Sequence, residues 1–175
     1  MRIKLLIASA LLIPVFIAGC LLSGTIVLPP IELEGFGSIS NSMQTKQVNL
    51  SDLSSDYDDN KDKLKSVDAV TIVGDVVNNG TLETGMDIYL SDEVLTDPDD
   101  VEDPAHATLI FVSPTIPAGD TLTLHWADGM DFMRNFNVLF DQIKGDGEFY
   151  LYGIPRNSIS ISYDLEIVIT ITVGS

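Results

Sequence analysis

Strict alternation of aliphatic and polar residues near the C-terminus constrains the fold more than any other feature of this sequence. Eight apolar side chains share one parity: Ile159, Ile161, Tyr163, Leu165, Ile167, Ile169, Ile171 and Val173. Polar residues take the other parity, with Val168 as the exception. Because successive side chains of a β-strand point to opposite faces, this pattern predicts a long strand with one buried face. A helix is excluded, since a period of two would scatter the aliphatic residues around its circumference.

Further strands are predicted along the chain. Residues 67–78 are rich in Val and Ile on both parities, as expected of a strand covered on both faces. Asn78-Asn79-Gly80 then predicts a turn. In residues 121–126 the alternation predicts that Trp126 faces the core and His125 faces out. Other predicted strands lie at residues 25–28, 86–91, 107–113 and 147–153, with one or two more in 35–50.

Two helices are expected between the strands. Residues 128–144 carry apolar side chains at three- and four-residue spacing, which predicts an amphipathic helix with Asp128 as its cap. A short helix is predicted near residues 55–65, capped by Ser54 or Ser55, with acids at its start and lysines at its end. Residues 96–104 hold two prolines and five acids, and are expected to form an exposed loop.

These elements predict a mainly β protein. About seven or eight strands, with turn residues at regular intervals, are typical of an antiparallel, immunoglobulin-like β-sandwich. A closed barrel is the alternative. The helix at residues 128–144 is expected to cross between the sheets or close one end of the sandwich, and the predicted domain spans residues 35–175.

The N-terminal region has the layout of a secretory signal. Arg2 and Lys4 precede an apolar run over residues 5–18, which is shorter than the roughly 20 residues that a membrane-spanning helix needs. The run ends in Ile17-Ala18-Gly19-Cys20, which resembles the lipobox of bacterial lipoproteins. The resemblance implies cleavage before Cys20, attachment of diacylglycerol to its thiol, and acylation of the new N-terminus. Residues 1–19 are then a lipoprotein signal peptide, and residues 20–34 a lipidated N-terminus with a short tether.

The lipid has consequences for location. One acyl chain binds a membrane reversibly, whereas two or three on the same residue give firm attachment. Leu21 follows the cysteine and is not the Asp that lipoprotein families use for inner-membrane retention, so the resemblance implies the outer membrane if the source has two membranes. Cys20 is the only cysteine, which excludes a disulfide within one chain. An alternative for the apolar residues after it is that Leu21, Leu22 and residues 26–28 enter the membrane interface.

Charge narrows the class of partner. The chain has a net charge of −17, and removal of Arg2 and Lys4 with the signal peptide would make it −19. Such a surface repels nucleic acid, so no nucleic-acid partner is expected.

The acidic residues suggest calcium as a possible ligand. Asp97, Asp99, Asp100 and Asp103 form one candidate group, and Asp56 with Asp58 forms another. Asp56, Asp58 and Asn60 match the first ligand positions of an EF-hand loop, but Lys61 and Val67 stand where that loop needs Gly and Glu. Solvated surface acids are the alternative explanation. The two histidines, His106 and His125, lie on neighbouring predicted strands but lack further ligands for a zinc site.

No catalytic motif stands out, and the sequence predicts a protein that is not an enzyme. It has no Gly-rich phosphate loop and no nucleophile elbow. Met133, Phe136 and Phe140 could line an apolar ligand groove, although such a stripe is more often core. The predicted function is a lipid-anchored cell-envelope protein whose sandwich serves as an interaction or structural module, with an envelope protein as partner and no obligatory cofactor. The alternatives are a calcium-dependent adhesion module and a carrier of an apolar ligand.

Overall fold

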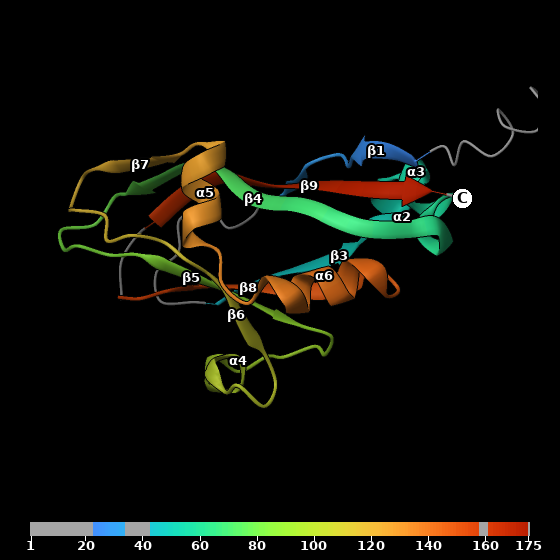
Figure 1. Cartoon of the computed structure of the whole chain (residues 1–175). Helices are drawn as coiled ribbons and strands as arrows, with labels where there is room; N and C mark the ends of the chain where they lie inside the picture. Colours follow the sequence, from blue (N-terminus) through green and yellow to red (C-terminus); the bar gives the residue numbers. More distant parts are fainter. Residues whose placement is uncertain (1–22, 34–42, 158–160, 175) are drawn as a thin grey trace, which may run out of the picture.

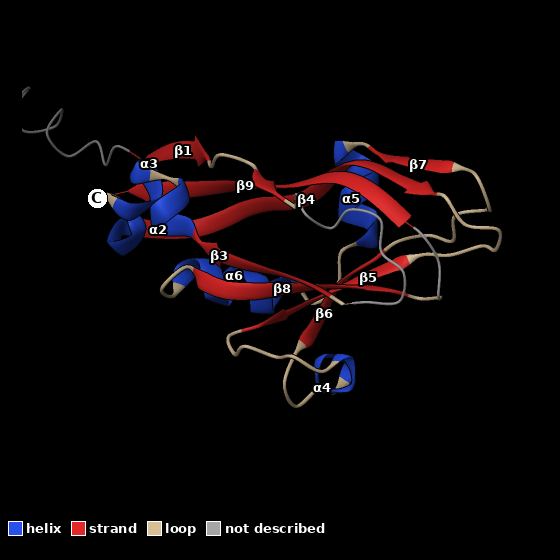
Figure 2. Cartoon of the chain, turned by 180° about the vertical axis from the view of Figure 1, so that it is seen from behind, coloured by secondary structure: helices blue, strands red, loops and turns tan. Residues whose placement is uncertain are grey.

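The computed structural model describes residues 23–33, 43–157 and 161–174, and within them two antiparallel sheets are stacked face to face (Figures 1 and 2). Residues 17–20, which resemble a lipobox, lie outside these residues. The five-stranded sheet has the order β1-β9-β4-β7, with β2 also paired to β9. Its strands are β1 (Ser23–Val27), β2 (Ile31–Glu32), β4 (Leu64–Asn78), β7 (Thr121–Leu124) and β9 (Ile161–Gly174).

The second layer is a four-stranded sheet with the order β3-β8-β5-β6. Its strands are β3 (Gln44–Asn49), β5 (Met86–Ser91), β6 (Thr108–Val112) and β8 (Glu148–Pro155). The predicted antiparallel β-sandwich is therefore confirmed. Within that class, β2, β9, β4 and β7 face β3, β8, β5 and β6, which is the strand order of a jelly roll and differs from the immunoglobulin order. Alternation tells which face of a strand is buried, but it does not tell which strand lies beside it.

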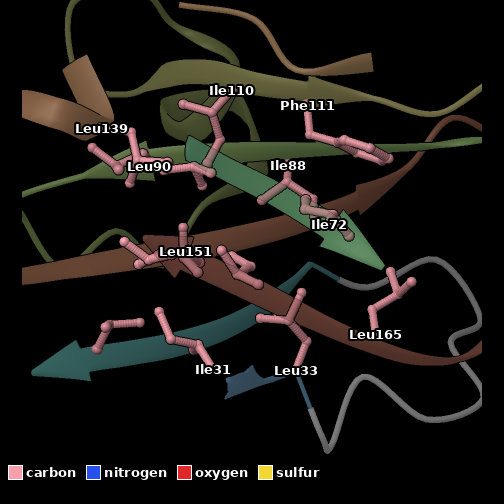
Figure 3. Packing of buried hydrophobic residues seen from close by; sticks show 14 of the residues in the cluster. Ile31, Leu33, Ile72, Ile88, Leu90, Ile110, Phe111, Leu139, Leu151 and Leu165 are labelled. Carbon is pink, nitrogen blue, oxygen red and sulfur yellow. The ribbon is translucent and has the colours of Figure 1, made fainter. Parts of the chain in front are cut away.

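The long strand β9 has the buried face that its alternation predicts. Ile161, Leu165, Ile167, Ile169 and Ile171 are all at most 1% exposed. These side chains meet those of the opposite sheet in one continuous core, and Figure 3 shows members of it from both layers together with α6. The contacts come from Ile31 and Leu33 after β1, Ile72 of β4, Ile88 and Leu90 of β5, Ile110 and Phe111 of β6, Leu151 of β8 and Leu139 of α6.

The sandwich begins earlier than residue 35, where the sequence placed its start. β1 pairs with the end of β9, and β2 pairs with its middle. Leu28, Ile31 and Leu33 are at most 2% exposed, so the apolar character of this segment serves the core. The strand predicted at residues 25–28 is present as β1, and insertion of residues 26–28 into the membrane interface was the alternative; the sequence did not predict that the chain pairs with β9 again after Pro29-Pro30.

The prediction of a single helix over residues 128–144 is wrong, because the structure has two helices in this region. α5 (Trp126–Phe132) and α6 (Phe136–Lys144) are separated by an extended segment in which Met133 forms a bridge to Phe111 and the Arg134 amide donates to the Ile110 carbonyl at 2.7 Å. Asn135 restarts the helix at a φ of 46°. The pair runs along one side of the sandwich, from the level of one sheet to the other (Figure 1).

The alternation predicts that Trp126 faces the core, and this prediction is wrong. Trp126 begins α5 and is 42% exposed. Asp128 is not the cap, because that position belongs to His125, which makes no side-chain capping bond. The strand ends at Leu124, which pairs with Gly74, so the alternation of β7 does not continue to Trp126.

The short helix expected near residues 55–65 is divided. α2 (Leu50–Leu53), α3 (Ser55–Asp58) and the 3-10 turn η1 (Lys61–Lys63) lead into β4 at Leu64. The predicted cap is correct, since the Ser54 hydroxyl accepts from the Tyr57 amide at 3.2 Å. The expected exposed loop at residues 96–104 contains a helix, α4 (Pro98–Glu102), whose Val101 is fully buried.

Candidate functional site: the anchor end of the sandwich

The candidate lipidation site, Cys20, precedes the first described strand by three residues. Cys20 itself is outside the described residues, but β1 begins at Ser23, three residues later. Three residues of fully extended chain span at most about 11 Å. Ser23 is paired with Gly174 at the end of β9. We call this region, made of Ser23, residues 50–65 and Gly174, the anchor end.

The anchor end is held together by bonds between distant parts of the chain. The Asn49 side chain accepts from two amides at the start of α2, and Ser54 caps α3. The fully buried Tyr57 donates its hydroxyl proton to the Ile143 carbonyl of α6 at 2.8 Å. Burial, together with the nearby carboxylates of Asp146 and Asp58, raises the pKa of Tyr57 and keeps its hydroxyl protonated as a donor.

Little room is left around this tyrosine. Gly147 has a φ of 76°, and a Cβ there would lie 2.5 Å from the Tyr57 hydroxyl oxygen. The tyrosine therefore fixes the end of α6 against α3, and the anchor end forms one packed unit with the sandwich.

Charges at the anchor end nearly balance. Residues 50–65 contain five aspartates and three lysines, which gives this stretch a net charge of −2. Lys61 lies 2.9 Å from an Asp58 carboxylate oxygen and also donates to the Ser51 hydroxyl. The hydrogen bond from Lys61 lowers the pKa of Asp58. Because its net charge is negative, this stretch provides no electrostatic attraction to anionic lipid.

Three of the six acidic side chains proposed for calcium have local structural roles, and Asp56, Asp99 and Asp100 lie in the first turns of α3 and α4. Asp97 caps α4 by accepting from the Asp99 amide at 3.0 Å, and Asp103 accepts from the Ala105 amide at 2.9 Å. Asp58 pairs with Lys61. Among residues 23–33, 43–157 and 161–174, the structure brings no three His, Cys, Asp or Glu side chains into an arrangement that could hold a metal ion.

The two histidines have separate positions. His106 lies 3.9 Å from Glu93 beside β5, whereas His125 precedes α5. The sequence predicts that both histidines lie on neighbouring strands, but neither lies within a strand.

The residues proposed for an apolar groove pack against the core. Met133 is buried, and Phe136 and Phe140 are half-buried with ring centroids 5.7 Å apart. Three surface pockets of about 280 to 330 Å³ lie elsewhere. They are lined around Tyr163 and Asp164, around Tyr89 and Leu109, and around Lys46 and Asn49.

Sequence reasoning missed an ion pair at the opposite end of the four-stranded sheet. Arg156 lies 3.3 Å from the Asp87 carboxylate, and its guanidinium also donates to the Ser113 carbonyl and hydroxyl oxygens. Burial raises the pKa of Asp87, and Arg156 opposes that rise. The sequence contains only a weak signal for this pair. Asp87 alternates with the buried residues of β5, but no local pattern links it to Arg156, which lies 69 positions later.

No helix in the described part of the chain is long and apolar enough to cross a membrane.

Comparison with known proteins defines no family. No protein-family model matches the chain, and no curated protein matches it. Among solved structures, the chain is similar to one titled turnip yellow mosaic virus, with 8% identity, a TM-score of 0.43, and coverage of 89% of this chain and 82% of that one. It is also similar to one titled desmodium yellow mottle tymovirus, with 10% identity, a TM-score of 0.36, and coverage of 89% and 87%. At these scores neither likeness carries an argument about function, and the class is defined by the strand order alone: a jelly-roll sandwich.

Proposed function

We propose that this protein is a lipid-anchored cell-envelope protein whose jelly-roll sandwich acts as a non-enzymatic interaction or structural module. The observation that carries the proposal is the sequence Ile17-Ala18-Gly19-Cys20 at the end of an apolar run. A sheet strand follows after only two intervening residues. A lipid on Cys20 would therefore attach the folded body directly, without a long tether.

The body offers features suited to a module with a surface role. Its charged side chains lie mainly in turns and on strand faces, which leaves a strongly acidic exterior over a continuous apolar core. A net charge of −19 after cleavage would keep copies of the protein apart on a crowded membrane. A protein partner in the envelope is part of this proposal.

The anchor is tested by membrane fractionation of the protein in its native host. Wild-type protein should sediment with membranes and incorporate an alkyne-labelled fatty acid, whereas Cys20→Ala should do neither. Gly24→Ala is the matched control, because a Cβ at Gly24 has open space around it and should leave attachment unchanged. Equal partitioning of the wild type and Cys20→Ala would defeat the proposal.

The membrane is tested separately, in a host with two membranes. The resemblance to lipoproteins implies an outer-membrane location for the wild type, since Leu21 is not the retention residue. Leu21→Asp should shift the protein to the inner membrane fraction. The same distribution for both proteins would refute the outer-membrane assignment while leaving the lipid anchor intact.

A further inference from the structure

We propose that the sandwich stands upright on the bilayer, with the anchor end against the lipid headgroups and the opposite end pointing away from the membrane. This inference rests on the lipid anchor at Cys20. It identifies the lipid-facing surface as α2, α3, η1 and the ends of β1 and β9, and it leaves the loops at residues 79–85 and 113–120 as the outward surface.

The first support is the short distance between lipid and sheet. Cys20 and Ser23 can be separated by at most about 11 Å. Ser23 pairs with Gly174, and Val173 pairs with Leu64 at the start of β4. In Figures 1 and 2 the start of β1, α2, α3 and the C-terminus gather at the same end of the molecule, and β7 lies towards the other end.

The second support is the length of the body. β4 has 15 residues and runs from Leu64 at the anchor end to Asn78, which pairs with Ile161. A strand rises about 3.3 Å per residue, so β4 spans roughly 45 Å. Because the lipid holds only the anchor end, a flat orientation would have to bring the whole of this length, and the sheet face along it, against the headgroups.

The third support is the charge on the outer face of the five-stranded sheet. Asp68, Asp75, Asp164 and Glu166 lie on the face opposite the buried residues of β4 and β9. Asp75 and Asp164 are direct neighbours across the strand pair. Lying flat on this face would strip water from four carboxylates, which costs free energy through desolvation.

The proposed orientation does not depend on electrostatic attraction between the anchor end and the membrane. Its residues 50–65 carry a net charge of −2. Lysines near an anionic surface contribute about 1 kcal/mol each, but the five neighbouring aspartates oppose the three lysines. The orientation is therefore set by covalent attachment and should not change with salt.

Single cysteines can measure this orientation, because lipid consumes the only native thiol. Three variants each carry one fluorescent maleimide at an exposed position: Lys63→Cys at the anchor end, Glu32→Cys on the β1–β2 edge, and Leu82→Cys at the far end. Leu82 is 66% exposed. The lipidated full-length proteins are reconstituted in phosphatidylcholine vesicles with nitroxide on a fraction of the headgroups. Quenching should be several-fold stronger at position 63 than at position 82, intermediate at position 32, and unchanged in high salt.

Two results would overturn the upright orientation. Equal quenching at positions 63 and 32 would show a body lying on its edge, and equal or stronger quenching at position 82 would show the opposite or no fixed orientation. Failure of the anchor has a different signature: the wild type, without an introduced cysteine, would react with the maleimide and stay off the vesicles. The orientation and the anchor therefore fail separately.

Discussion

Gly74 should be the glycine that the fold tolerates losing least. It lies in the middle of β4, where that strand pairs with Leu165 of β9 on one side and Leu124 of β7 on the other. Its φ is 121°, a conformation that side chains with a Cβ rarely adopt. A Cβ there would clash with the Asp164 carbonyl oxygen and lie 3.0 Å from its carbon and 3.1 Å from the Leu165 Cα.

The cost of Gly74→Ala can be worked out from these two effects. A strained backbone costs about 1–3 kcal/mol, and overpacking against atoms that cannot move aside costs about 1–3 kcal/mol more. The total of about 2–6 kcal/mol is a large part of the roughly 5–15 kcal/mol that stabilises a domain. The atoms that would be hit belong to the β9 backbone, so the variant must separate β4 from β9 at this point or remain strained.

Two other glycines in the same chain separate strain from contact. Gly119 has a φ of 77° with open space around it, so Gly119→Ala should cost only the strain, about 1–2 kcal/mol. Gly24 has neither feature, and Gly24→Ala should stay within about 0.5 kcal/mol of the wild type. Urea unfolding of residues 20–175 with Cys20→Ser gives the three free energies by linear extrapolation. A Gly74→Ala value equal to that of Gly119→Ala would refute the contact argument.

Three further changes test other contacts by the same unfolding assay. Gly129→Ala should cost about 1–3 kcal/mol by pushing α5 away from β4, because the new Cβ would lie 3.0 Å from the Ile72 carbonyl carbon; no loss would show that α5 can shift freely. Tyr57→Phe should cost about 1–3 kcal/mol by leaving the buried Ile143 carbonyl without its donor, and a neutral result would contradict that role. Burial raises the pKa of Asp87 above its usual 3.8, so the folded state binds this proton more readily than the unfolded state. The stability of the wild type relative to Asp87→Asn should therefore rise as the pH falls through the folded-state pKa towards 3.8; the opposite slope would mean that Arg156 dominates.

The sequence predicted the elements whose residues carry their own periodicity. β9 follows from its alternation, and the second half of the 128–144 stripe appears as α6. The Ser54 cap follows from local chemistry, since its hydroxyl needs only the amide three residues later. Each of these signals lies within one short stretch of chain.

The missed features depend on partners far away in the sequence. The helix breaks after Phe132 because the next residues pair with β6, and nothing near Met133 or Arg134 announces that pairing. Trp126 continues the parity of Leu124, but β7 stops where its pairing with β4 stops. The jelly-roll order itself is a matter of which strands become neighbours, and alternation is silent on this.

The candidate site likewise has one part that local sequence predicts and other parts that depend on distant residues. The residues that resemble a lipobox are contiguous, so the sequence alone is enough to propose Cys20 as a lipidation site. The place of Ser23 at the end of the sheet needed the register of β1 with β9. Asp87 and Arg156 meet only through the folding of β5 and β8 together, and no local pattern marks either residue.

The position of β9 also has a consequence for how the protein is made. This strand is synthesised after the eight described strands that precede it in the sequence, yet it lies between β1 and β4 and pairs with β2 as well. The first strands therefore wait for their central neighbour until β9 has been synthesised, and such distant pairings make folding slow. The five-stranded sheet cannot close early, and a nascent chain stalled before residue 161 would lack the middle of this layer.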